Sequence, residues 1–520
     1  MLRWFKLTLC LASAMTPLAA RAQTPPLERA SIVELDRALS SGRLTSAQLV
    51  RFYLDRIGRM DHAGPNLHAI IALNPDAMSQ ARSLDAARGR APRGPLYGIP
   101  ILVKDNIETA DAMATTAGSL ALAKNVSHRD APLVARLRAA GAIILGKTNL
   151  SEWANFRSSH ATSGWSGMGG LARNPYALDR SACGSSSGSA AAVAAGFAAA
   201  AVGSETDGSV TCPSSMNGVT GFKPSLGQIP RTHIIPIAHS QDTAGPITHT
   251  VADAALMMAV MSGADAGDAA SQDASAPAGS AFATAPADLR GKRLGVLRFP
   301  AGAYPNLDSV YEAALTRLRQ AGAVLVEVSL PDAPKVGADE TLVLKTEMKA
   351  DMAAYLASTP ASVGPRTLAD LIAFNRATPA ETKLFDQDLF EQSQATKGLD
   401  DPAYIAARAE SLRQTGAEGL DKLLNAKHLD ALVAPTTSVA WKIDLIYGDN
   451  NPGSFGSFPA VAGYPHLTVP MGLAGGLPVG LSVIGAKWSD PKVMALGEAF
   501  QALSPAIPPP GFPADLDPAP

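Results

Sequence analysis

The chain has 520 residues, of which 47% are hydrophobic and 17% charged, so it can bury a large core and is not intrinsically disordered. Its 44 basic and 46 acidic residues give a formal net charge of −2, which offers no electrostatic footprint for nucleic acid or for an anionic membrane. Three cysteines are too few for a disulfide scaffold, and a globular enzyme of one large domain or two to three ordinary ones is the favoured class.

The N-terminus has the pattern of a secretory signal peptide. Arg3 and Lys6 precede an apolar run, and Ala20-Arg21-Ala22 fits a small-x-small cleavage site. The apolar run is short for a helix that spans a bilayer. We therefore expect residues 1–22 to be removed, residues 23–520 to form the mature chain, and the protein to be exported to the periplasm or secreted.

Two cysteines remain after signal cleavage, Cys183 and Cys212, because Cys10 leaves with the signal. The two can form one bridge, although the sequence carries no geometric information about it. Export is thus not used here to build a cysteine framework.

The first half of the mature chain alternates helical and strand-like patterns. Apolar residues at helical spacing predict two opening helices, carried by Ile32, Leu35 and Leu39 and then by Leu49, Leu54 and Ile57. Short apolar runs predict a strand over Leu96–Val103 leading into Lys104, a helix over Pro132–Ala140 and a buried strand over Ala142–Leu145. The run Ser187–Gly203 is almost all Ala and Gly, and we expect a helix that packs closely against neighbouring backbone rather than a membrane span.

The second half begins after a candidate linker. Residues 263–288 are rich in Ala, Asp, Ser, Gly and Pro. After them, a strand at 293–297, a helix at 309–320 and a strand at 324–328 indicate a parallel β-α-β unit. Further buried strands are expected at 431–434, 466–469 and 479–484. The whole pattern predicts one large α/β domain, with a subdivision at the linker left open.

Three motif matches are interpreted as accidental. Gly141–Thr148 fits the phosphate-binding loop, but its middle is a strand-like apolar run after a helix, so no ATP site is expected. Gly184–Gly188 fits the nucleophile elbow around Ser186, but a loop precedes it instead of a strand. Ser489–Lys492 fits a serine–lysine motif that helix capping explains better. The nine histidines show no metal-ligand spacing, and no metal is expected.

Two serine- and glycine-rich segments flank the alanine-rich run. They are Ser181–Ser189 and residues 203–213, and the second holds Ser209. Glycines before a serine allow backbone N–H groups to converge on one point, as an oxyanion hole requires. A serine nucleophile also needs a base, and neither segment contains a histidine. Lys104, at the end of a predicted strand, is the alternative base.

Seven ordered blocks of the sequence resemble the amidase signature family, over nearly the whole mature chain. The blocks are Gly98–Asp105, Gly141–Asn149, Cys183–Ala190, Gly203–Ser209, Gly221–Pro224, Ser240–Pro246, and Ala462–Pro465 with Thr468–Pro470. The resemblance implies a single α/β/α sandwich around a mixed β-sheet, in agreement with the α/β pattern above. It also implies hydrolysis without a metal or an organic cofactor.

The resemblance assigns roles residue by residue through a serine–cis-serine–lysine triad. Ser209 would be the acyl-forming nucleophile, Ser185 the bridging serine after a cis Gly184–Ser185 bond, and Lys104 the base. The backbone N–H groups of Thr206, Asp207 and Gly208 would form the oxyanion hole. Ser187 and Asp207 stand where most members have glycine, and Asp207 places a carboxylate beside the nucleophile.

A lysine base makes one physical demand. A free lysine has a pKa of ~10.4, so only about one amine in 2,500 is neutral at pH 7. Burial beside two hydroxyls is expected to lower the pKa of Lys104 and to keep its amine a base.

Within the family, Glu205–Ser209 and Asn149–Asn155 are most similar to the exported bacterial peptide amidases. The resemblance implies cleavage of C-terminal carboxamides of peptides or N-acyl amino acids, with release of ammonia. The alternatives are a general aliphatic or aryl amidase, a glutamine-hydrolysing component of a tRNA amidotransferase, and a non-catalytic binding protein. We expect a small-molecule or peptide amide as substrate and no nucleic acid, membrane or obligate protein partner.

Overall fold

The computed structural model describes residues 25–89, 93–283, 285–300, 303–331, 335–451 and 453–516. The predicted signal peptide, residues 1–22, lies outside these ranges. Within them, no helix has both the length and the apolar character that crossing a membrane demands.

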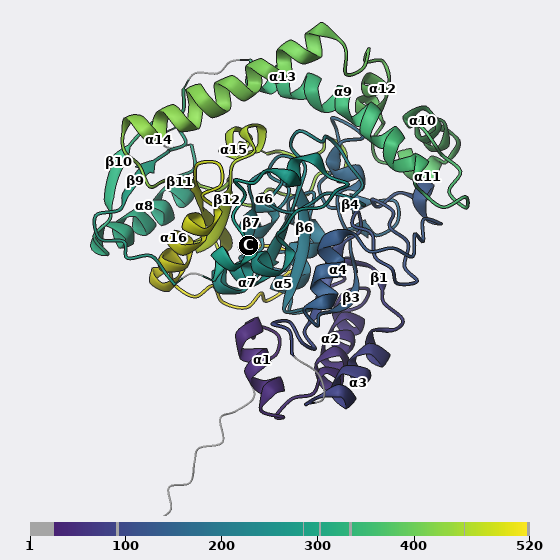
Figure 1. The fold of residues 1–520 in the computed structure, drawn as a ribbon, viewed down its shortest axis with the longest axis horizontal. Helices are drawn as coiled ribbons and strands as arrows, with labels where there is room; N and C mark the ends of the chain where they lie inside the picture. Colours follow the sequence, from purple (N-terminus) through teal and green to yellow (C-terminus); the bar gives the residue numbers. More distant parts are fainter. Residues whose placement is uncertain are drawn as a thin grey trace, which may run out of the picture.

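One mixed sheet of eleven strands organises the chain (Figure 1). In spatial order its strands are β1 (Ile70–Leu73), β3 (Ile143–Thr148), β2 (Pro100–Lys104), β6 (Ala200–Glu205), β8 (Thr243–Thr248), β7 (Thr220–Lys223), β12 (His466–Ala474), β13 (Leu477–Ile484), β11 (Ala431–Pro435), β9 (Arg293–Val296) and β10 (Val324–Glu327). Strands β3, β2 and β6 run parallel, as do β11, β9 and β10, and the other neighbours are antiparallel. A separate ribbon pairs β4 (Trp165–Ser166) with β5 (Gly170–Leu171).

Helices cover both faces of this sheet, which makes the fold an α/β/α sandwich. One row consists of α4 (Pro132–Ala139), α7 (Val251–Met261), α16 (Asp490–Leu503) and α8 (Pro305–Gln320), and α5 (Ser187–Ala194) and α6 (Thr211–Met216) belong to the other. Successive side chains of a strand point to opposite faces. Accordingly, Leu467 and Val469 of β12 lie against Gly497 of α16, whereas Thr468 lies on the α6 side near Ser215.

The remaining helices lie at the two ends of the molecule. The opening helices α1 (Ile32–Ser40) and α2 (Ser46–Met60) confirm the sequence prediction, each begins at a capping box, and α3 (Ala77–Ala87) packs beside α2. At the opposite end, the long helices α9 (Val336–Ala357) and α13 (Pro402–Thr415) lie side by side and arch over the molecule (Figure 1). The shorter helices are α10 (Leu368–Ala377), α11 (Pro379–Thr382), α12 (Asp388–Gln394), α14 (Lys422–Ala426) and α15 (Ser457–Ala462).

The alanine-rich run corrects one sequence expectation. A single helix over Ser187–Gly203 is wrong in its second half, because α5 ends at Ala194 and strand β6 begins at Ala200. Between them, Gly196 has a φ of +70°, and a side chain there would collide with the carbonyl of Glu28. A fully buried run of Ala and Gly shows no periodicity that separates a buried helix from a central strand.

The second half of the chain follows the predicted order of elements. Strand β9, helix α8 and strand β10 form the expected parallel unit, and β11, β12 and β13 include the other three predicted strands. The hairpin between β12 and β13 turns at Gly475 and Gly476, both with positive φ, as a tight two-residue turn requires. The candidate linker 263–288 joins α7 to β9 and contains the turns η3 (Ala269–Gln272) and η4 (Gly279–Phe282). Strands from both sides of it belong to the same sheet.

Candidate active site

Lys104 is the last residue of β2, and its side chain is fully buried. Strand β2 runs parallel to β6, so the carboxyl ends of both strands meet at one edge of the sheet, where open α/β sheets form their sites. Nζ of Lys104 lies 2.6 Å from Ser185 Oγ, 3.0 Å from Ser204 Oγ and 3.1 Å from the Ser204 carbonyl oxygen. The structure therefore brings the predicted base into contact with the predicted bridging serine.

The surroundings of Lys104 meet the demand for a basic amine. Burial lowers the pKa of Lys104 to about 7, while the carboxylates of Asp242 and Glu205 act in the opposite direction. About half of the amines with such a pKa are neutral at pH 7. The amine can therefore accept a proton at physiological pH.

Ser185 lies two residues before the start of α5 and follows a cis peptide bond from Gly184, as the resemblance implies. Its carbonyl accepts a hydrogen bond from the N–H of Ser151 at 3.0 Å. Gly184 packs so closely that a side chain there would collide with the hydroxyl of Ser151. Contacts with the buried Ser151 thus hold Gly184 and Ser185 in place.

Ser209 lies in the turn between β6 and α6 and lines a cavity of about 470 Å³. Its carbonyl accepts a hydrogen bond from the N–H of Ser186 at 3.1 Å. A disulfide between Cys183 and Cys212 joins the segment before Ser185 to the segment after Ser209. Among the described residues, the Ser185 hydroxyl is bonded to Lys104 and no hydrogen bond links it to the Ser209 hydroxyl.

The backbone between β6 and Ser209 leaves donors open toward the cavity. In the described chain, the N–H groups of Thr206, Asp207 and Gly208 donate to no protein acceptor. After Ser209, the N–H groups of Val210 and Thr211 donate instead to the buried carboxylate of Glu205 at 2.7 and 2.9 Å. Adjacent free N–H groups beside a serine are the arrangement that an oxyanion hole needs.

The carboxylate of Asp207 points toward the start of α15. It accepts a hydrogen bond from Ser457 Oγ at 2.7 Å. Burial raises the pKa of Asp207 to about 6, and the Ser457 hydroxyl partly opposes that shift. Burial and the negative charge of Asp207 raise the pKa of Glu340 to about 8, so Glu340 is largely neutral at pH 7. Asp207 lines the same cavity as Ser209.

The three accidental motif matches have structural roles. In the phosphate-loop match, residues 143–148 form β3, and Nζ of Lys147 donates to the Ile107 carbonyl. Ser186 follows a loop and donates to the Ser204 carbonyl at 3.1 Å. Ser489 is the N-cap residue of α16 and Pro491 lies in the first turn, as the capping interpretation expects, but the Ser489 hydroxyl donates to the Ala486 carbonyl and makes no side-chain cap.

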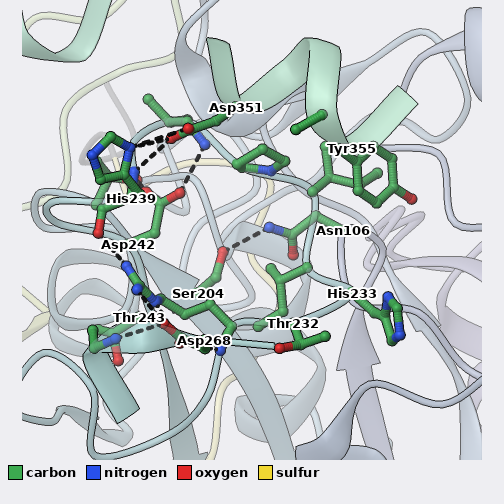
Figure 2. Close-up of a pocket in the computed structure, with 18 of the residues that line it drawn as sticks. Asn106, Ser204, Thr232, His233, His239, Asp242, Thr243, Asp268, Asp351 and Tyr355 are labelled. Carbon is green, nitrogen blue, oxygen red and sulfur yellow. Dashed lines mark hydrogen bonds and ion pairs between the residues drawn. The ribbon is translucent and has the colours of Figure 1, made fainter. Parts of the chain in front are cut away.

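A second cavity, of about 570 Å³, is bordered by Ser204, whose hydroxyl contacts Lys104 (Figure 2). Asn106 and Ser204 line it, and Figure 2 shows the hydrogen bond between them. Both cavities border Ala154, Thr206 and Ile237. Neither Asn106 nor Ser204 is among the site residues predicted from the sequence. The signal that could have found them is their position, since Asn106 is two residues after Lys104 and Ser204 belongs to the block that ends at Ser209.

Two clusters of metal-ligating groups occur in the described residues, and sequence spacing did not reveal them because each draws on distant segments. They are His160 with Asp386 and Asp388, and His239 with Glu347 and Asp351. In the second, Nδ1 of His239 lies 2.9 Å from a carboxylate oxygen of Asp351, so the histidine already has a partner. Neither cluster includes a residue of the predicted triad.

Comparison with known proteins shows the family to which the chain belongs. The model of the amidase family matches residues 48–494, and the chain belongs to that family. A probable amidase of Arabidopsis thaliana is 37% identical over 501 residues, covering 94% of this chain and 92% of the relative.

Two further similarities bear on the kind of amidase. The crystal structure of the native peptide amidase of Stenotrophomonas maltophilia is 49% identical and superimposes with a TM-score of 0.90, over 94% of this chain and 99% of that one. A component of the glutamyl-tRNA(Gln) amidotransferase of Roseiflexus castenholzii is 34% identical, over 92% of this chain and 96% of the relative. The amide-hydrolase prediction is thus confirmed at the level of the family.

Proposed function

We propose that this amidase releases ammonia from the C-terminal carboxamide of peptides or N-acyl amino acids, with Ser209 as nucleophile, Ser185 as bridging serine and Lys104 as base. One observation carries the proposal: a buried lysine with a pKa of about 7 lies 2.6 Å from Ser185, beside the cavity that Ser209 lines. A neutral amine in contact with a serine hydroxyl is the group that such a relay requires.

The proposed reaction has two halves. Ser209 Oγ bonds to the amide carbon as its proton passes to Ser185, whose own proton passes to Lys104. The N–H groups of Thr206, Asp207 and Gly208 stabilise the negative oxygen of the tetrahedral intermediate. The C–N bond then breaks, and the leaving nitrogen takes the proton back and departs as ammonia. Water attacks the acyl-enzyme along the same relay, giving the carboxylic acid and free Ser209.

The choice of a peptide amide rests on similarity and on the cavity. The peptide amidase described above shares 49% identity with nearly the full chain. The cavity beside Ser209 combines apolar side chains, including Phe156, Leu344 and Trp441, with polar groups that can bond a peptide backbone. Asp207 adds a carboxylate that disfavours a negatively charged substrate end through like-charge repulsion.

The test compares a peptide amide with the same peptide lengthened by one residue, following ammonia and peptide products. We expect ammonia from the amide and no cleavage of the internal bond in the longer peptide, because the proposed function requires a cleft with no room for another residue on the leaving side of the scissile amide. Equal cleavage of the internal bond, or activity confined to short aliphatic amides, would contradict the peptide-amidase proposal and leave amide hydrolysis intact. Free glutamine, assayed in parallel, tests the amidotransferase alternative.

We also propose that the protein is exported and loses residues 1–22. The basic start, the apolar run and the Ala20-Arg21-Ala22 site support this, and the Cys183–Cys212 bridge is typical of an oxidising compartment. N-terminal sequencing of the protein from cell fractions is the test. A mature chain that begins at Gln23 in the periplasm or medium is expected, whereas an intact Met1 in the cytoplasm would contradict it.

A further inference from the structure

Whether Lys104 can act as a base depends on which of its hydrogen bonds it donates and which it accepts. Nζ has three oxygen neighbours, the hydroxyls of Ser185 and Ser204 and the carbonyl of Ser204, at 2.6, 3.0 and 3.1 Å. A neutral amine has two N–H groups and one lone pair, so it donates twice and accepts once. For Lys104 to act as the base proposed above, its lone pair must face Ser185.

Of these three oxygens, the Ser204 hydroxyl is the competitor for that lone pair. The Ser204 carbonyl only accepts, so it always takes an N–H of Lys104. A hydroxyl can rotate and donate instead. If Ser204 donated its hydrogen to Nζ, the second N–H would turn toward Ser185, and Lys104 would be unable to take the proton of that serine.

Asn106 removes this competition. Its Nδ2 lies 2.9 Å from Ser204 Oγ (Figure 2), and the residue is only 3% exposed. Its backbone carbonyl accepts the N–H of Ile235 at 2.8 Å, which holds the loop independently of the side chain. The oxygen of the same amide, Asn106 Oδ1, is buried and has no hydrogen-bond partner. The nitrogen and oxygen of an amide exchange places by a half-turn of its plane, which brings Oδ1 to Ser204 Oγ as the acceptor of its hydrogen. That hydrogen then points away from Nζ, and Ser204 Oγ accepts an N–H of Lys104.

We infer that Asn106 is a positioning residue of the active site, which holds the Ser204 hydroxyl as an acceptor and so leaves the lone pair of Lys104 to Ser185. The inference rests on the proposed function, in which Lys104 is the base. Asn106 and Ser204 line the second cavity and not the cavity of Ser209. Asn106 therefore acts through Ser204 and not through the substrate.

A double-mutant cycle separates this role from a general packing role. Asn106→Leu keeps the size of the side chain and frees the Ser204 hydroxyl, and we expect kcat to fall about 10- to 100-fold with little change in KM. Ser204→Ala removes the competing hydroxyl and is expected to cost less than about 10-fold. In the Ser204→Ala background, Asn106→Leu should cost less than about twofold more, because no hydroxyl remains to be misdirected.

The pH profile gives a second readout that packing alone would not move. An aspartate at position 106 accepts the Ser204 hydrogen, so it still keeps that hydrogen away from Nζ. It also adds a carboxylate to those of Asp242 and Glu205, which already raise the pKa of Lys104. We expect Asn106→Asp to shift the midpoint of the kcat–pH profile upward by about 1 to 2 units, with kcat at high pH near the parental value.

The experiment measures amide hydrolysis and also the rate at which a fluorophosphonate modifies Ser209. In that reaction the serine oxygen bonds to phosphorus, fluoride leaves, and the proton passes through Ser185 to Lys104. Thr232→Val, in the same second cavity, is the matched control and should change neither rate by more than about twofold, because Thr232 Oγ1 bonds to Asp265 and not to the lysine network.

Either of two results overturns the inference. One is a kcat of the Asn106→Leu/Ser204→Ala variant reduced by the product of the two single losses. The other is parental kcat and phosphonylation rates in Asn106→Leu. Failure of the proposed function gives a different result. A parental enzyme that is phosphonylated at Ser209 but hydrolyses no amide would refute the function, and the phosphonylation rates of the variants would still decide the role of Asn106. Absence of phosphonylation in the parental enzyme would refute both.

Discussion

At the scale of single residues, the pKa of Lys104 sets the pH dependence of the whole site. Because the base must be neutral, kcat should rise with pH through one apparent pKa near the value of about 7 that burial imposes. Lys104→Ala should lower kcat by about 10²- to 10⁴-fold without unfolding the protein. Initial rates from pH 5 to 9 and a far-ultraviolet circular dichroism spectrum check both statements.

The matched control for this variant is Lys492→Ala, which removes a surface lysine that pairs with Asp430 at 2.8 Å, far from the site in sequence and outside both cavities. It should leave kcat and its pH profile unchanged. A folded Lys104→Ala enzyme with the parental kcat would contradict the lysine-base mechanism.

Ser186 illustrates a serine of the signature with a structural role. Its hydroxyl donates to the Ser204 carbonyl at 3.1 Å and accepts from the Ser204 N–H at 3.2 Å. Ser186→Ala leaves that buried N–H unsatisfied, so the free energy of unfolding should fall by about 1 to 3 kcal/mol, with kcat reduced only mildly. Urea denaturation and initial rates test this, and a loss of activity as large as that of Ser209→Ala at full stability would contradict it.

At the scale of elements, the disulfide connects the two segments that carry the serines. Cys183 and Cys212 are 29 residues apart in sequence, and a cross-link closing a loop of that size stabilises a fold by roughly 2 to 4 kcal/mol. We expect Cys183→Ala/Cys212→Ala to lose that much stability and to lose activity, because Gly184 and Ser209 are no longer tied together.

Urea denaturation of the parental protein and of the double variant, each with and without dithiothreitol, tests the contribution of the disulfide. Reduction should bring the parental protein to the stability of the double variant and leave the variant itself unaffected. A parental protein insensitive to dithiothreitol, with a free-thiol count of two, would contradict the bridge.

Hydrophobic periodicity predicted the opening helices, whose two faces differ in polarity. It assigned strand β6 wrongly to a helix, because β6 is buried on both faces. The opening helices have one apolar side; in α1 the buried residues Ile32, Leu35 and Leu39 repeat at helical spacing. Strand β6 is buried along its whole length between β2 and β8, and its Ala and Gly residues have no polar face to mark a strand period. The motif blocks located Lys104, Ser185 and Ser209. The hydrogen bond from Asn106 to Ser204 joins the loop after β2 to β6, and it follows only from the pairing of these two strands.

At the scale of the whole molecule, the continuous sheet bears on the question of subdivision at residues 263–288. Strand β7 from the first half pairs with β12 from the second, and the main hydrophobic core includes residues from both halves. We therefore expect a single calorimetric unfolding transition. Two separated transitions, with fragments on either side of the linker protected independently in limited proteolysis, would favour two domains.

The central claim is that Ser209 forms the acyl-enzyme, activated through Ser185 and Lys104. Its most direct test is mass spectrometry of a peptide map after rapid acid quench of the enzyme turning over a slow N-acyl amino acid amide. We predict an acyl adduct on Ser209 of the parental protein and none on Ser209→Ala. An adduct on Ser186 or Ser185, or an adduct that persists in Ser209→Ala, would contradict the claim.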